Sequence, residues 1–241
     1  MSAAGPQFIP NAAAGLSGTA VHSSPQKSAL ARLLHALNQP LTGLQCSLEL
    51  AVAVPRRPEE YVRTIREGLD LTHRMRDLVD AMREVIDIRE SSIRLDQRMV
   101  LGDALVEVAD ELRPVAKGRQ IRIAVGCESP ATIAGERQFF VALIFRLIES
   151  LLSRAKADSE IEVAARPDKG QIQLEIGWIE AAHAQNRQLS HAELGLILVE
   201  TGCQKLGGRW ERRCNGERHS CAMSFPLAAG GADSLSSEDH N

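Results

Sequence analysis

Leucines recur every three or four residues along the first periodic part of the chain, which places them on one stripe of an α-helix. They are Leu30, Leu33, Leu34, Leu37, Leu41, Leu44 and Leu48. Ser24 and Pro25 indicate the helix start, because serine caps a helix and proline is tolerated in its first turn. The pattern stops at a loop that contains Pro55 and Pro58. We therefore predict one long helix before this loop.

A second periodic stretch of apolar residues runs from Tyr61 to Ile86, and Glu59 and Glu60 lie in its first turn, where the helix dipole favours acids. Together the two stretches predict an antiparallel helical hairpin over residues 25–90, with arms of about 30 residues, each ~45 Å long. One hairpin is a poor core by itself. Two hairpins packed as a four-helix bundle would bury both stripes, so we expect a homodimer.

The region from 93 to 227 alternates helix and strand patterns. The last four predicted strands form two hairpins, the first with Pro and Gly in its turn and the second around Asn215-Gly216. The whole chain is expected to have an α+β fold, a hairpin followed by an α/β sandwich. Helices are predicted over 102–117, 138–156 and 192–206, and strands over 121–125, 161–165, 171–176, 209–214 and 220–226. Residues 1–24 and 228–241 are predicted to be a flexible leader and tail.

Composition and charge argue against several classes of protein. The chain of 241 residues is 44% hydrophobic and 24% charged, with a net charge of −3, which argues against binding nucleic acid by bulk charge. No apolar run approaches the roughly 20 residues of a membrane span, and the N-terminus does not have the pattern of a secretory signal. The five cysteines are scattered and odd in number, which favours reduced thiols in the cytoplasm.

The chemistry is concentrated around His35 on the first helix. Its imidazole lies beside the leucine stripe and should point to solvent. Five residues later a proline, Pro40, removes a backbone hydrogen bond and bends the helix. An exposed imidazole can act as a nucleophile at phosphorus. Asn38 and Gln39, one turn away, could orient the reacting group. The alternative interpretation is an ordinary surface histidine.

The string His-Ala-Leu-Asn-Gln-Pro-Leu at 35–41 resembles the H-box of two-component sensor histidine kinases and matches the His-Glu-Leu-Asn-Gln-Pro-Leu subgroup at six of seven residues. The resemblance covers residues 28–227. It implies a dimerisation and histidine-phosphotransfer bundle, a Bergerat-type ATP-binding domain, a response-regulator receiver domain as partner and His35 as phospho-acceptor. Ala36 replaces the family's acid, whose carboxylate would make the imidazole more nucleophilic.

Several nucleotide-binding positions of the family are altered. With Gly135 taken as the start of the long helix, Arg146 and Ser150 replace the two asparagines that hold phosphate and Mg²⁺, whereas Glu149 fits the acidic position between them. Trp178 replaces the aspartate that reads adenine, and we interpret it as a core residue in preference to a filler of the purine pocket.

The last glycine box retains Gly195 but has Glu193 at its first glycine, where its negative charge would lie near a triphosphate and each such charge pair costs ~4 kcal/mol. The lid, 181–191, is short and lacks glycine. We expect no cofactor, with ATP and Mg bound only if this degenerate site is active. No metal site is predicted, because Cys214, His219 and Cys221 do not have a standard metal-ligand spacing.

The favoured hypothesis is a two-component protein in which His35 carries a phosphoryl group to or from a receiver aspartate. The first alternative is an active ATP-dependent histidine kinase. The second is a non-catalytic dimer that sequesters a response regulator.

Overall fold

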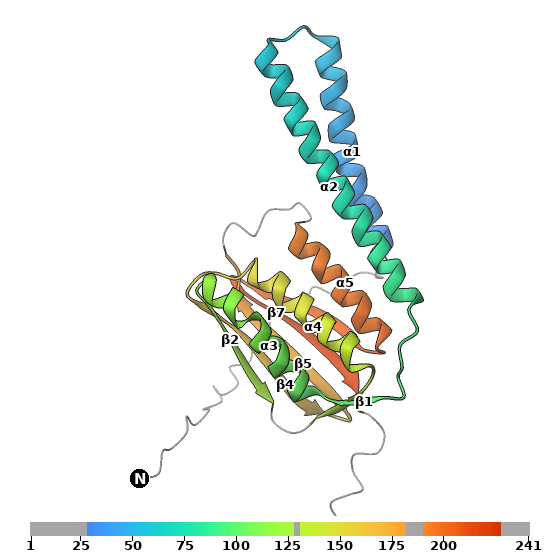
Figure 1. Cartoon of the computed structure of the whole chain (residues 1–241), viewed down its shortest axis with the longest axis vertical. Coiled ribbons are helices and arrows are strands. Elements are labelled where there is room, and N and C mark those ends of the chain that lie inside the picture. The colour runs from blue at the N-terminus through green and yellow to red at the C-terminus, as the bar shows by residue number, and fades with distance from the viewer. Residues whose placement is uncertain (1–27, 128–130, 182–189, 228–241) are drawn as a thin grey trace, which may run out of the picture.

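The computed structural model describes residues 28–127, 131–181 and 190–227. These form a long helical hairpin and a domain in which helices cover one face of a β-sheet, so the predicted α+β architecture is confirmed (Figure 1). The predicted leader and tail, the Ser24-Pro25 cap and most of the predicted lid lie outside the described residues.

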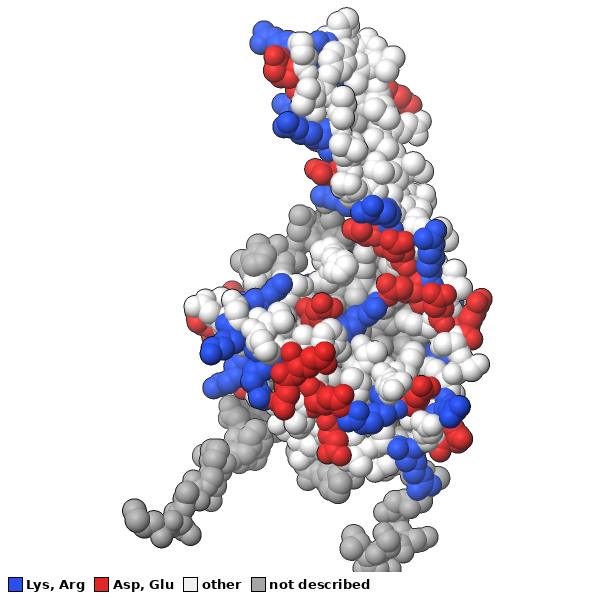
Figure 2. Space-filling model, viewed as in Figure 1, with Lys and Arg blue, Asp and Glu red and all other residues white. Residues whose placement is uncertain are grey.

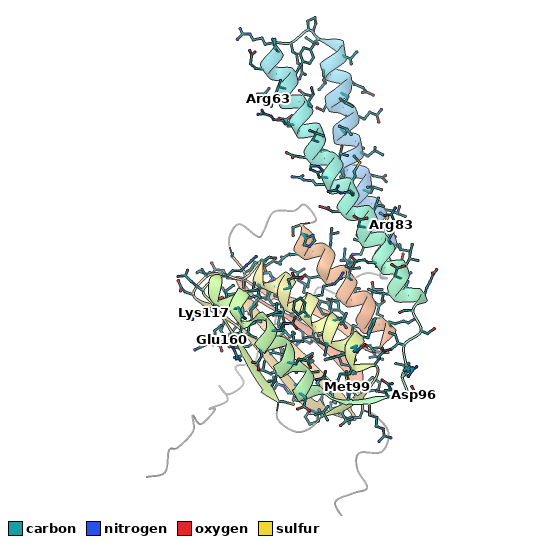
Figure 3. All side chains as sticks on the ribbon, viewed as in Figure 1. Arg63, Arg83, Asp96, Met99, Lys117 and Glu160 are labelled. Carbon is teal, nitrogen blue, oxygen red and sulfur yellow. The ribbon has the colours of Figure 1, made fainter. Side chains whose placement is uncertain are left out.

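The hairpin consists of α1 (Ala29–Ala53) and α2 (Pro58–Glu90). Ser28 caps α1, since its Oγ accepts a hydrogen bond from the N–H of Ala31 at 3.3 Å. At the start of α2, the N–H of Arg57 donates to Glu60 Oε2 at 3.0 Å. The labelled Arg63 and Arg83 show how far α2 extends, from the loop end of the hairpin to the second domain (Figure 3).

The leucine stripe of α1 divides between two environments. Leu33 is fully buried, whereas Leu34, Leu41 and Leu48 are each about half exposed, at 54%, 51% and 50%. The prediction that one partner hairpin buries the whole stripe is therefore wrong for its first turns. These turns pack on the second domain of the same chain instead.

The second domain contains a five-stranded sheet in the order β2-β4-β5-β7-β6. β2 and β4 are parallel and the other neighbours are antiparallel. Both predicted hairpin turns are present, and Lys169, Gly170 and Gly216 adopt the positive φ angles that tight turns require. The strands are β2 (Ile121–Cys127), β4 (Ser159–Asp168), β5 (Gln171–Ile179), β6 (Arg209–Asn215) and β7 (Arg218–Pro226).

Three helices cover one face of this sheet (Figure 1). They are α3 (Leu101–Gly118), α4 (Arg137–Leu152) and α5 (His191–Lys205). On β5 every second side chain from Ile172 to Trp178 is buried in the core beneath them, which is the alternation expected of a sheet covered on one face. Helix α4 ends at Leu152, four residues before the predicted end.

A two-stranded sheet of β1 (Arg98–Val100) and β3 (Thr132–Ala134) was not predicted. Each strand has three residues, which is too short to show an alternating pattern. Met99 of β1 is labelled in Figure 3 and is buried in the main core. The small sheet therefore extends the core beside the chain that leaves the hairpin.

The hairpin and the second domain pack together through α5. Leu33 and Val85 of the hairpin and Ile197 of α5 are fully buried in a shared apolar cluster, and each such side chain stabilises by roughly 1.5–3 kcal/mol. We call this the docking cluster; its buried members are Leu33, Ala36, Leu78, Ala81, Val85, Leu194, Ile197 and Leu198. Arg32 Nη1 adds an ion pair with Glu200 Oε2 at 2.6 Å.

Charged side chains gather where the hairpin meets the second domain, and few lie on the α1 side of the upper hairpin (Figure 2). Among its 25 residues, helix α1 carries two charged side chains, Arg32 and Glu49, and one histidine, His35. In the part of the chain that the structure describes, no helix is both long and apolar enough to cross a bilayer.

Candidate functional site

His35 lies on the exposed surface of α1, two residues after the buried Leu33. Asn38 and Gln39 are also exposed and follow at the i+3 and i+4 positions, so the three side chains lie on neighbouring parts of one helix surface. Helix α1 continues through Pro40, and Thr42 Oγ1 donates to the carbonyl oxygen of Asn38 at 2.9 Å. The exposure predicted for His35 is confirmed, so its imidazole is accessible from solvent.

Ala36, the residue that departs from the H-box, has a structural reason. It is 8% exposed and belongs to the docking cluster with Leu194 of α5. A glutamate here would bring a carboxylate into an apolar contact, which costs free energy unless a partner compensates it. The side chain that would assist the imidazole is thus absent at a position where the second domain packs.

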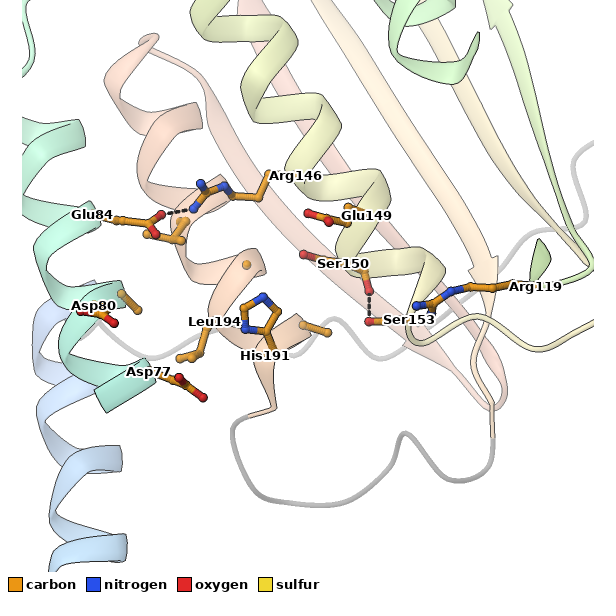
Figure 4. A pocket seen from close by; sticks show the side chains of 14 residues that line it. Asp77, Asp80, Glu84, Arg119, Arg146, Glu149, Ser150, Ser153, His191 and Leu194 are labelled. Carbon is orange, nitrogen blue, oxygen red and sulfur yellow. Dashed lines mark hydrogen bonds and ion pairs between the residues drawn. The ribbon is translucent and has the colours of Figure 1, made fainter. Parts of the chain in front are cut away.

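A cleft of about 440 Å³ lies between α2, α4 and α5 (Figure 4). Arg146, Glu149, Ser150 and Gly195, the four predicted nucleotide-site positions, all line it. We call it the interdomain cleft. The structure therefore brings together residues that are up to 49 positions apart in sequence (146 to 195).

A second cavity, of about 370 Å³, adjoins the interdomain cleft. The two share Asp77, His191 and Leu194 as lining residues, and the second cavity extends to Gln39 and Pro40 on α1. Helix α1 and the predicted nucleotide-site positions thus line adjoining cavities at the hairpin base.

Two of the four cleft residues have contacts that oppose their predicted role. The guanidinium of Arg146 forms an ion pair with the carboxylate of Glu84 on α2 (Figure 4). Ser150 is buried, and its Oγ would lie only 2.1 Å from a Cβ built on Gly195. Gly195 therefore permits close packing of α5 on α4, and this contact occupies the space beside Ser150.

The cleft walls are acidic on the hairpin side. Asp77, Asp80 and Glu84 project from α2, and Glu149 lies opposite on α4 (Figure 4). Arg119 also lines the cleft, but its Nη1 donates to the carbonyl oxygen of Leu152 at 3.0 Å. An anionic polyphosphate would meet several like charges here, which disfavours binding.

Sequence reasoning missed a buried ion network at the start of α5. Arg154, 6% exposed, lies directly after α4 and bridges the carboxylates of Glu180 and Glu193. Arg212 Nη1 of β6 is 3.1 Å from Glu193 Oε1 on the other side. Burial raises the pKa of Glu193, but Arg212 and Arg154 outweigh it and hold this pKa below its ordinary value.

The network corrects the expectation for Glu193. We expected its negative charge to repel a bound triphosphate. Two arginines neutralise it, so the predicted ~4 kcal/mol repulsion loses its premise. The same pairing engages Arg154 and Arg212 with protein carboxylates near the N-terminus of α5.

Trp178 is a core residue, as preferred in the sequence analysis. Its side chain is 1% exposed within the main core, and its Nε1 donates to Glu180 Oε2 at 2.8 Å. Glu180 lies two residues further on and is also buried. The period-two alternation that buries Ile176 and Trp178 was the available signal, because it continues to an acid that needs a buried cation.

No three His, Cys, Asp or Glu side chains within the described residues are grouped as a metal ion would require. Of the residues weighed in the sequence, Cys214 contacts His219, with Sγ 3.4 Å from Nε2, while Cys221 is buried in the core.

No protein-family model matches the chain. Among curated proteins it is similar to the sensor protein IrlS of Burkholderia pseudomallei, with 26% identity over an alignment of 194 residues that covers 73% of this chain. The chain spans 41% of the length of that relative.

Among solved structures, the histidine kinase AdeS of Acinetobacter baumannii superimposes with a TM-score of 0.52 at 15% identity, over 80% of this chain and 98% of that one. Full-length ShkA in complex with AMPPNP gives a TM-score of 0.53 at 19% identity, over 83% of this chain and 45% of that one. Both structures share the fold described above. Taken together, the sequence relative and the shared fold support the resemblance to two-component histidine kinases that the sequence analysis described.

Proposed function

We propose that this chain carries a phosphoryl group on His35, exchanges it with an aspartate of a response-regulator receiver domain, and does not draw it from ATP. The observation that carries the proposal is the contrast within the site. His35, Asn38 and Gln39 are exposed to an incoming partner, whereas Arg146 and Ser150 are engaged by Glu84 and by the packing against Gly195.

The transfer step needs only a neutral imidazole and an acyl phosphate. A ring nitrogen of His35 attacks the phosphorus of the receiver's aspartyl phosphate, the N–P bond forms, and the P–O bond breaks as the aspartate leaves as a carboxylate. The other ring nitrogen releases its proton to solvent. In the opposite direction the carboxylate attacks and the imidazole leaves. Asn38 and Gln39 are placed to orient the phosphoryl oxygens.

ATP-dependent autophosphorylation would need more from this chain. Ala36 offers no carboxylate to assist the imidazole, and α2 lines the interdomain cleft with acids that repel phosphate. The AMPPNP complex of ShkA is a property of that protein. For this chain, ATP and Mg²⁺ remain the requirement of the alternative in which it is an active histidine kinase.

We also propose that the working unit is a homodimer. Leu34, Leu41 and Leu48 are spaced seven residues apart, and each is at least half exposed on a helix with few charges. On α2, Ile65 and Leu69 are exposed at 60% and 54%. A second hairpin would cover these side chains as a four-helix bundle.

We propose a cytoplasmic location as well. A response-regulator receiver as partner and cysteines present as free thiols both fit that compartment.

The test of phosphotransfer uses the purified full chain and a His35→Gln control. One arm of the experiment contains γ-labelled ATP with Mg²⁺. The other contains receiver domains that have been phosphorylated with labelled phosphoramidate. We expect acid-labile label on the wild-type chain from a receiver and none from ATP, with the His35→Gln chain unlabelled in both arms.

Label from ATP on the wild type alone would establish the kinase alternative. If neither arm labels the chain while a receiver binds it, and His35→Gln binds that receiver equally well, the non-catalytic sequestering alternative stands.

The test of the dimer is Leu41→Lys. A lysine at the middle of the exposed leucine row places charge in the proposed bundle core, so the mass in solution should fall from two chains to one. Glu49→Lys, at an exposed and already charged position off the leucine row of the same helix, is the matched control and should remain dimeric. Light scattering coupled to gel filtration measures both, and a wild-type monomer at micromolar concentration would reject the dimer.

A further inference from the structure

Cys214 and His219 form a pair at the end of the β6–β7 hairpin that the proposed function does not use. They are directly opposed across the two strands, so their side chains lie on the same face of the sheet. Cys214 Sγ lies 3.4 Å from His219 Nε2. The cysteine is exposed, whereas His219 is 9% exposed, so solvent and small solutes reach the thiol but not the base beside it.

The second ring nitrogen of His219 faces an acid. Nδ1 lies 3.7 Å from Glu180 Oε2 and is buried with no hydrogen-bond partner among the described residues. The ring also lies against Trp178, with centroids 5.6 Å apart, which holds its orientation. The tautomer with the proton on Nδ1 points that proton toward the carboxylate and leaves the Nε2 lone pair directed at the Cys214 thiol.

We propose that Cys214 is a reactive thiol, with His219 as its base and Glu180 as the group that orients His219, and that it is oxidised by hydroperoxides. The arrangement has the order that activated nucleophiles use: nucleophile, base and an orienting third group. A thiol without such a base is only a few per cent thiolate at neutral pH.

The oxidation step balances with the peroxide alone. The Cys214 proton moves to His219 Nε2, and the sulfur attacks one peroxide oxygen. The S–O bond forms and the O–O bond breaks, so sulfur is oxidised by two electrons and the peroxide is reduced. The leaving hydroxide takes the proton from the imidazolium as water. The product is a sulfenic acid, the first and reversible step of cysteine oxidation.

Burial keeps His219 uncharged at neutral pH, although acids and arginines surround it. Four charged groups act on it, two acids against two arginines: Glu180 directly after β5, Glu193 on α5, Arg212 on β6 and Arg154 after α4. Burial lowers the pKa of His219 below its ordinary value, and this outweighs the acids, which raise it. At neutral pH the ring is therefore uncharged and able to accept the thiol proton.

The experiment treats the full chain with hydrogen peroxide at pH 7 in the presence of dimedone, which traps sulfenic acids. Each labelled cysteine is then mapped by mass spectrometry over time. Cys46 and Cys127 are exposed thiols of the same chain and serve as internal references. We expect Cys214 to be labelled at least about 10-fold faster than either. Equal rates for Cys214 and Cys46 would overturn the proposal.

His219→Gln separates the base from simple exposure. Glutamine keeps a polar side chain but cannot take the thiol proton, so Cys214 labelling should fall to within about twofold of Cys46, with Cys46 itself unchanged. An unchanged Cys214 rate in a folded variant would show that His219 is not the base.

A pH profile of the wild type tests the same point without a variant. An unassisted thiol with a pKa near 8.5 should react about 25-fold faster at pH 9 than at pH 7. We expect less than about a fivefold rise for Cys214, because His219 removes the proton at both pH values. A rise as steep as that of Cys46 contradicts the proposal.

Discussion

The two regions that meet at the hairpin base treat their reactive positions in opposite ways. On α1, His35, Asn38 and Gln39 are exposed and only the neighbouring Ala36 is used for packing. In the interdomain cleft, Arg146 is paired with Glu84 and Ser150 packs against Gly195. One region leaves its polar groups accessible to a second molecule, and the other uses them within the chain.

The difference teaches that residues can line one cleft and still have their polar groups engaged within the chain. The four predicted nucleotide-site positions all line the interdomain cleft, and Arg154 near the start of α5 pairs with Glu180 and Glu193. Arg146, Arg154 and Arg212 are thus all paired with carboxylates of the same chain. The predictions below test how firmly they do so.

Arg154→Ala should have the largest effect, because it leaves the buried Glu180 carboxylate without its cation. We expect the free energy of unfolding in urea to fall by about 3–5 kcal/mol. Arg122→Ala is the matched control, since Arg122 pairs with Glu160 at the surface at 2.5 Å, and it should cost less than about 1 kcal/mol. Similar losses for both variants would mean that the network is not structural.

Ala36→Glu restores the family's acid and should have the next largest effect. The new carboxylate enters the docking cluster, so we expect a loss of about 1–3 kcal/mol in unfolding free energy and no labelling from ATP. Ala31→Glu, at an exposed position of the same helix, should stay within about 0.5 kcal/mol of wild type. ATP labelling of the Ala36→Glu chain would show that the missing acid alone silences the kinase reaction.

The stability that the Arg154 network contributes should depend on pH through Glu193. Its pKa is lowered in the fold, so its ion pairs contribute stability that is present above the ordinary pKa of 4.5 and is lost as pH falls through the folded value. Glu193→Gln removes this titration. The gap in unfolding free energy between wild type and variant should therefore narrow from pH 5 toward pH 3, measured by urea denaturation at each pH. A gap that stays constant would mean that Glu193 does not titrate with folding.

Arg146→Ala should have the smallest effect. Arg146 and Glu84 are 42% and 44% exposed, and such pairs contribute about 0–1 kcal/mol. Stability should be nearly unchanged, and opening this corner of the cleft should not create ATP binding, because Ser150 and the acids of α2 remain. Calorimetry with ATP and Mg²⁺ checks the second expectation, and binding in the variant alone would identify Arg146 as the residue that closes the site.

The sequence predicted most of the architecture because local patterns dictate it. The leucine spacing gave α1, the alternation on β5 gave a one-sided sheet, and Gly170 and Gly216 marked the turns. The cleft residues were found through the family resemblance. The network of Arg154, Glu180 and Glu193 was not found, because its members come from three elements that only the tertiary fold brings together. The docking of Leu33 on α5 was missed for the same reason.

Strand β6 lies at one end of the five-stranded sheet, where an unpaired row of backbone groups could accept a strand from another molecule. Its exposed positions carry Arg209, Glu211 and Arg213, and the last two form an ion pair. Charges along such an edge discourage edge-to-edge pairing with a strand of another molecule. The alternating arginines and glutamate on β6 therefore disfavour the joining of two copies of the chain through this edge.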